Sequence, residues 1–137
     1  MGDTIQKVNY FHMEVSNKIG EGARILSVIQ DAGINLLAFT GFPSGRKAQI
    51  DFIPQDTESF KKTAKKAGWT LSVKKTGFLV QGTDRVGAVG EILSELSEAK
   101  INVVAIDAIT TGEGRYGAIF WVKPSDVQKT SKTLGAF

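Results

Sequence analysis

The chain of 137 residues has an apolar content of 42%, a charged content of 23% and a formal net charge of +3. These values are ordinary for a globular protein, and no apolar run approaches the roughly 20 residues that a membrane-spanning helix requires. The absence of cysteine excludes a disulfide framework and thiol chemistry, and the N-terminal residues lack the apolar core of a secretion signal. We therefore expect a soluble, cytoplasmic protein with no membrane partner.

The first half of the chain predicts elements in the order β-α-β-β-α-β. The predicted strands cover residues 8–15, 35–42, 46–53 and 69–73. Of the two helices, the first ends at Gly33 and the second runs from Asp56 or Thr57 to Gly68. This order predicts an antiparallel sheet with both helices on one face.

The second half repeats this pattern. A strand at 78–82 opens it, and a polar turn with a central glycine, Gly87, follows. Asp84 lies before the following helix, where we expect its carboxylate to cap the first amide groups. The apolar residues of that helix fall at i, i+3, i+4 and i+7, namely Val89, Ile92, Leu93 and Leu96. A strand follows from Asn102, then a hairpin at 111–114, a return strand at 115–122 and a last helix.

A shift of 67 residues (101 − 34) places Ile34-Asn35 over Ile101-Asn102, and Gly20 over Gly87. Because polar and apolar positions match without gaps, we interpret the chain as a tandem repeat. The predicted fold is α+β, with ferredoxin-like βαββαβ units at 1–75 and 76–137. The second unit lacks its last strand. Since a bare sheet edge invites pairing, we expect an N-terminal strand or another subunit to cover it.

The stretch Asp84-Arg85-Val86-Gly87, followed by a helix and Asn102, resembles the ACT domain family. The usual pattern of that family is Asp-Arg-Pro-Gly, a leucine-rich helix and Asn-Ile at the next strand, so Val86 replaces the proline. The first copy, Asn17-Lys18-Ile19-Gly20 with Asn35, is looser. In both copies the turn residue and the strand asparagine are 18 residues apart (35 − 17 and 102 − 84).

The resemblance implies a regulatory module that binds an amino acid or another small metabolite, often between two domains paired through their sheets. It places the ligand at the turn and at the strand asparagine. At the turn, helix amides attract a carboxylate. The asparagine carboxamide can both donate and accept a hydrogen bond. One candidate site is Asn17, Ile19, Gly20, Glu21 and Asn35. The other is Asp84, Val86, Gly87, Ala88 and Asn102. We expect a small-molecule effector, a homodimer formed by sheet pairing and a regulated enzyme as partners, and neither a cofactor nor a metal.

Each of these residues also has a purely structural interpretation. The glycines can serve the turn alone, and the asparagines can bond local backbone. A ligand-free assembly module is therefore one alternative.

RNA binding is another alternative, because the same element order builds the RNA-recognition module, which stacks bases on strand aromatics. Residues 115–122 echo its signature, but the glycine is displaced and Ile119 replaces an aromatic residue. We therefore do not expect a nucleic-acid partner. Catalysis is not expected either, since the sequence has one histidine, no cysteine and no phosphate-binding loop motif.

Overall fold

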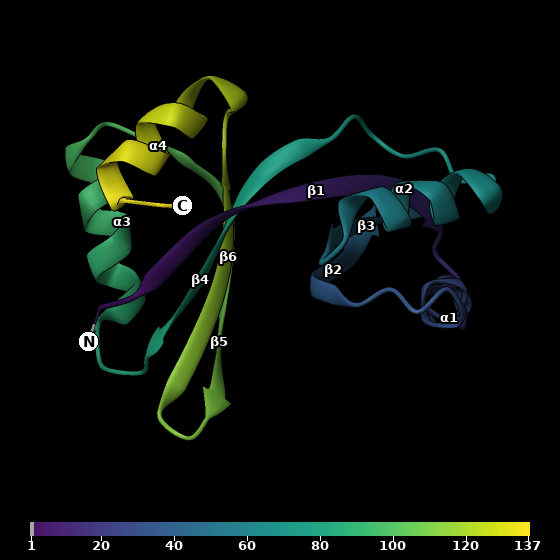
Figure 1. Ribbon diagram of the computed structural model, residues 1–137, viewed down its shortest axis with the longest axis horizontal. Coiled ribbons are helices and arrows are strands. Elements are labelled where there is room, and N and C mark those ends of the chain that lie inside the picture. Colours follow the sequence, from purple (N-terminus) through teal and green to yellow (C-terminus); the bar gives the residue numbers. More distant parts are fainter. Residues whose placement is uncertain (1) are drawn as a thin grey trace. The chain divides into compact units, whose positions relative to one another are not determined.

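The computed structural model describes residues 2–137, which form two compact units (Figure 1). The first unit is Asn9–Lys75, and the second combines the residues up to Val8 with Thr76–Phe137. Each unit builds antiparallel strands and packs helices against them, which confirms the predicted α+β class with ferredoxin-like repeats. Within residues 2–137, no helix is long and apolar enough to cross a membrane.

The first unit is organised around its middle strand. Its elements are β1 (Thr4–Ser16, from Asn9 onward in this unit), α1 (Glu21–Asp31), β2 (Leu36–Ser44), β3 (Lys47–Pro54) and α2 (Thr57–Lys66). Strand β3 pairs antiparallel with both β1 and β2. Alternate residues of β1 and β3 face the helices and are buried with three helix residues: Phe11, Met13, Ile50, Phe52, Ile25, Ile29 and Phe60. The alternation follows from the two-residue period of a strand.

The predicted fourth strand at 69–73 is wrong. The segment meets β1 at one point, where the Ser72 amide donates to the His12 carbonyl over 2.8 Å. In return the His12 amide donates to the Ser72 hydroxyl over 3.0 Å, so a side chain takes the place of a backbone acceptor. A strand requires a continuing ladder of backbone bonds. Trp69, the first residue of the predicted strand, instead stacks on Phe52 with ring centroids 5.8 Å apart.

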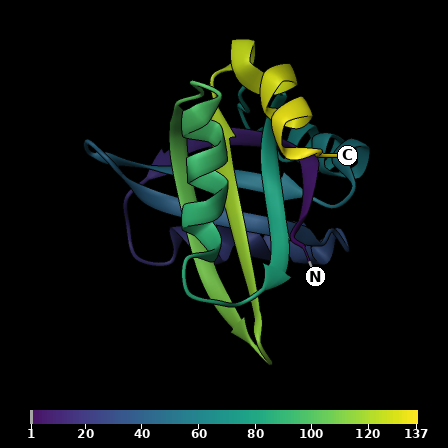
Figure 2. The ribbon, with the colours of Figure 1, turned by 90° about the vertical axis from the view of Figure 1, so that its left-hand side faces the viewer.

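The second unit places two helices on one face of its sheet (Figure 2). Its elements are β4 (Lys75–Thr83), α3 (Ala88–Glu98), β5 (Val103–Gly112), β6 (Arg115–Val122), a 3-10 turn at Pro124–Asp126 and α4 (Val127–Leu134). Strand β6 pairs antiparallel with β4 and β5. Phe78 and Phe120 stack with ring centroids 5.1 Å apart, beneath the buried Ile92 and Leu96 of α3.

The N-terminal strand covers the free edge of β4, which is one of the two covers expected from the sequence. In this unit β1 is the neighbour of β4, and its Ile5 is buried in the same core as Phe78. The end of the chain pairs with the same residues, since the Phe137 amide donates to the Ile5 carbonyl and the Lys7 amide donates to the Phe137 carbonyl, over 3.1 and 2.8 Å. The residues up to Val8 thus complete a sheet formed by residues 76–137.

The docking of the N-terminal segment yields a stability prediction at Gly82. A Cβ atom added there would lie 2.0 Å from Asp3 Oδ1 and 2.9 Å from the Tyr116 ring. We expect Gly82→Ala to lower the free energy of unfolding by about 1–3 kcal/mol, the usual cost of overpacking.

The matched control is Gly90→Ala in α3, where the added Cβ meets nothing within 4 Å. That variant should be stabilised by about 0.5–1 kcal/mol, because alanine favours a helix over glycine. Urea denaturation of both variants checks the pair, and equal stabilities would contradict the placement of Asp3 over Gly82.

Candidate functional site

The two predicted turns have the same backbone conformation. Gly20 and Gly87 are the N-cap residues of α1 and α3, with φ of 87° and 83°. This left-handed region favours glycine because a Cβ atom is strained there. Neither helix receives a side-chain cap from the described residues, whereas Asp56 caps α2 by accepting from the Ser59 amide over 3.1 Å. The first amide of each helix donates to a carbonyl of its own turn, Glu21 to Lys18 and Ala88 to Arg85, over 3.2 Å in both cases. Since the next amides of a helix have no acceptor within it, these are the donors that both turns offer to an anion.

The predicted capping role of Asp84 is therefore wrong. Gly87 occupies the N-cap position, three residues after Asp84, and no side chain among the described residues accepts a capping hydrogen bond from the first amides of α3. Asp84 is exposed, and its own amide donates to the Gly114 carbonyl over 2.8 Å. Its carboxylate therefore lies beside the turn rather than on the helix amides.

Each turn also exposes a large aliphatic side chain directly before its glycine. Ile19 is 107% exposed and Val86 is 104% exposed. Next to them, Glu21 begins α1 and is half-buried, while Ala88 begins α3 and is buried. In both units the predicted turn residues thus combine a helix N-terminus that lacks a side-chain cap with exposed apolar surface.

The turn of the second unit holds an arginine between two carboxylates. The Arg85 guanidinium donates to both oxygens of Asp3, over 3.2 and 3.3 Å, and to Glu91 over 2.5 Å. It also donates to the Thr83 carbonyl over 2.8 Å. Hydrogen bonds from Arg85 to Asp3, and then to Glu91, raise the pKa of the guanidinium above its usual value. Arg85 therefore stays charged and is already occupied by carboxylates of its own chain.

Tyr116 lies against this cluster and lines the same cavity as Arg85. It is only 5% exposed. Burial, and next the neighbouring Asp3 carboxylate, raise the pKa of the Tyr116 phenol to about 12. The site thus keeps a neutral phenol beside a fixed ion pair.

The asparagines do not lie with the turns. Asn35 and Asn102 are exposed and follow the C-terminal ends of α1 and α3, and Asn35 donates to the Gln55 side chain over 3.2 Å. Because α3 has 11 residues, its two ends are about 16 Å apart. Asp84, Gly87 and Ala88 line a cavity of about 300 Å³, whereas Asn102 lines a different one of about 410 Å³. One unit therefore does not bring the predicted site residues together.

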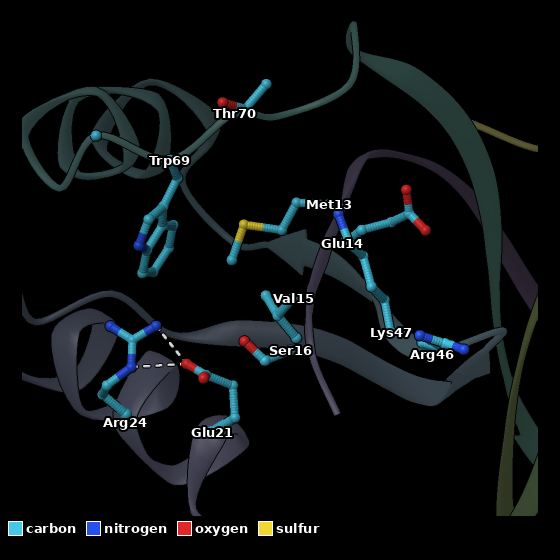
Figure 3. Close-up of a pocket in the computed structure, with 11 residues that line it drawn as sticks. Met13, Glu14, Val15, Ser16, Glu21, Arg24, Arg46, Lys47, Trp69 and Thr70 are labelled. Atoms are coloured by element: carbon cyan, nitrogen blue, oxygen red, sulfur yellow. Dashed lines mark hydrogen bonds and ion pairs between the residues drawn. The ribbon is translucent and has the colours of Figure 1, made fainter. Parts of the chain in front are cut away.

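The first unit has a larger cavity, of about 580 Å³, which the sequence did not predict (Figure 3). Of the predicted site residues, only Glu21 lines it. Its other walls include Met13, Trp69 and Arg24. The available signal was Trp69 itself, a large aromatic residue directly after the glycine that ends α2.

The comparisons with known proteins identify the second unit. Residues 78–137 match the family model of the ACT domain. These residues are similar to an ACT domain. No curated protein matches the chain.

Solved structures extend the likeness in fold to both units. A protein from Bacteroides thetaiotaomicron shares 16% identity over 96% of this chain and 88% of its own, with a TM-score of 0.82. The regulatory subunit of aspartate kinase from Thermus thermophilus, in its ligand-free form, shares 11% identity over 98% of this chain and 95% of its own, with a TM-score of 0.67. Aspartate kinase from Clostridium acetobutylicum shares 18% identity over 97% of this chain and 33% of its own, with a TM-score of 0.57. At these identities the similarity establishes the fold.

The geometry does not support the alternative of RNA binding. Tyr116, Phe120 and Trp121, the aromatic residues of β6, are 5%, 0% and 6% exposed. Base stacking requires open aromatic faces.

Among residues 2–137, no group of three or more His, Cys, Asp or Glu side chains is placed to hold a metal ion.

The raised pKa of Tyr116 predicts a pH dependence of stability. Its value of about 12 in the folded chain lies above the usual value of about 10, so the unfolded chain loses this proton first. The stabilisation from Tyr116 is therefore complete below pH 10 and is lost as the pH rises toward 12.

We expect the free energy of unfolding to fall less steeply between pH 10 and 12 in Tyr116→Phe than in the unsubstituted chain. Denaturation at several pH values, with phenolate absorbance as a second signal, measures the difference. Parallel pH profiles for the two proteins would contradict the assignment.

Proposed function

We propose that the protein is a non-catalytic regulatory protein that binds a small metabolite, an amino acid, at its glycine turns. It passes the signal on by pairing with a second copy or by docking on a regulated enzyme in the cytoplasm. One observation carries this function: both units open a helix with a left-handed glycine and leave its N-terminus without a side-chain cap. The same chain caps α2 with Asp56. Helix α4 also lacks a side-chain cap but follows directly on a 3-10 turn, so a left-handed glycine at an uncapped helix start is shared by the two repeated turns.

The chemistry of these turns suits a carboxylate. A helix N-terminus offers backbone donors and the positive end of the helix dipole to an anion. In the second unit, Gly87 and Ala88 line the cavity together with Asp84, whose carboxylate offers an acceptor to an ammonium group. The pair of opposite charges on an α-amino acid matches this combination.

A ligand that also contacts an asparagine requires a second copy of the chain. The turn and Asn102 lie at opposite ends of α3, about 16 Å apart, which is far longer than an amino acid. Strand β5 pairs with β6 on one side only and exposes Val104 and Ile109, at 59% and 69%. Antiparallel pairing of this edge with its copy would bring the Asn102 end of one protomer toward the turn of the other. Ligand binding would then shift the population toward the paired form.

The turn of the second unit gives the direct test of ligand binding. Combining Gly87→Val with Asn102→Ala should abolish binding in the second unit, because the valine side chain fills the space beside the helix amides. Calorimetric titration with the twenty amino acids, first on the unsubstituted chain, measures this loss.

The matched control is Gly45→Val in the β2–β3 hairpin of the first unit, since Gly45 also has a positive φ, of 65°, and open space around it. It carries the same backbone strain in the hairpin and should retain binding. If no amino acid bound the unsubstituted chain, the ligand-free assembly module would replace this proposal.

Pairing through β5 yields a second test. Ile109→Lys places a charge on the exposed edge, where lysine opposes strand pairing. We expect this variant to sediment as a monomer at concentrations at which the unsubstituted chain dimerises. Val73→Lys, at a loop residue that is 77% exposed, is the control and should leave the sedimentation unchanged. Equal sedimentation of Ile109→Lys and the unsubstituted dimer would exclude this edge.

A further inference from the structure

The cavity of the first unit is formed by four segments that meet at one end of the unit (Figure 3). These are the end of β1, the first turn of α1, the start of β3 and the loop after α2. Asn17, Ile19, Gly20 and Asn35, which the family resemblance singles out, are not among its lining residues. The volume of about 580 Å³ falls within the range of small-molecule sites.

One wall of the cavity is apolar and held in place. Trp69 is half-buried and stacks on the fully buried Phe52, with an angle of 11° between the rings. Met13, at 6% exposure, and the half-buried Val15 continue this wall from β1. A fixed indole provides a flat apolar surface, and a methionine thioether adapts to the shape of what packs against it. This wall suits a large apolar or aromatic side chain.

The facing wall carries a positive and a negative group side by side. Arg24 Nε donates to Glu21 Oε1 over 2.6 Å, and the two side chains form an ion pair one turn apart on α1. The Glu21 side chain is 13% exposed and that of Arg24 is 63% exposed. An arginine has five donors, so Arg24 retains donors for a carboxylate, and the second oxygen of Glu21 remains for an ammonium group. Figure 3 shows this pair and the Trp69 indole on the two sides of the same space.

The cavity lining has one more basic than acidic side chain, which is too little to compensate a phosphate or another multiply charged anion. The lining residues include three basic side chains, Arg24, Arg46 and Lys47, and two acidic ones, Glu14 and Glu21. With the Glu21–Arg24 pair neutral, the rest of the lining carries two basic groups against one acidic group. A zwitterionic ligand replaces the ion pair between Arg24 and Glu21 with two pairs, one from Arg24 to its carboxylate and one from Glu21 to its ammonium group. The net charge of the cavity then stays the same.

We propose that this cavity binds an α-amino acid with a large apolar side chain, with the zwitterionic head on Arg24 and Glu21 and the side chain on Trp69 and Met13. The inference rests on the proposed function, which it narrows to a ligand class and to a site separate from the glycine turns. Recognition uses both charges of the head, so a ligand that lacks either charge binds poorly.

Calorimetric titration of the full chain with phenylalanine, leucine and methionine tests the ligand class. We expect binding of at least one of the three, and affinity at least tenfold weaker for alanine, for the N-acetyl derivative and for the amide of the best ligand. Equal affinity for the N-acetyl derivative or the amide would overturn zwitterion recognition.

Substitutions in the two walls test the site. Arg24→Gln should weaken binding at least tenfold at little cost to folding, because the side chain is exposed. Trp69→Leu should weaken it similarly, with thermal unfolding followed to confirm that the chain is folded. The control is Glu58→Gln, which breaks an exposed ion pair with Lys61 on α2 and should leave affinity unchanged.

The outcomes separate this inference from the proposed function. Binding lost in Arg24→Gln but retained in Gly87→Val supports the cavity as the site. Binding retained in Arg24→Gln and lost in Gly87→Val overturns the cavity and leaves the proposed function standing. No binding by the unsubstituted chain overturns both.

Discussion

The edge of β4 is the constraint on which the second unit depends. Residues 76–137 provide three strands, and the side of β4 away from β6 needs a partner because exposed backbone groups at a sheet edge invite pairing. The residues up to Val8 supply that partner, with Ile5 in the core and Phe137 bonded to their backbone. The continuation of the same strand from Asn9 pairs with β3 in the first unit. One strand therefore serves both sheets, and a cut after residue 75 would leave the second unit incomplete.

Sequence patterns predicted the repeat because its signals are local. Gly20 and Gly87 mark turns whose backbone strains other residues, and the four apolar residues of α3 fall on one stripe whose Ile92 and Leu96 are buried. The strand predicted at 69–73 was wrong because a tertiary contact holds the start of that segment: Trp69 stacks on Phe52.

The grouping of site residues could not be read from sequence spacing. An interval of 18 residues between the turn and the asparagine spans a whole helix, so it fixes their separation rather than their contact. The cavity in the first unit was missed for a related reason. Its walls come from residues 13–16, 21–24, 46–47 and 68–70, and only tertiary packing brings these four segments together. The local sequence pattern identifies turns and the apolar faces of helices, whereas a cavity depends on how segments that are distant in the sequence pack together.

The two turns share a backbone but differ in their charges, and this difference bears on their use. Arg85 is already bonded to Asp3 and Glu91, so a ligand carboxylate at that turn competes with two carboxylates of the chain. Arg24 pairs with Glu21 among the described residues and has an exposed side chain. Because displacing a bidentate arginine–carboxylate contact is costly, the second turn is suited to holding the N-terminal segment in place. In the first unit, the ion pair between Arg24 and Glu21 is partly exposed and lies beside the fixed Trp69 indole. This pair is better suited than Arg85 to give up part of its internal contact when a ligand binds.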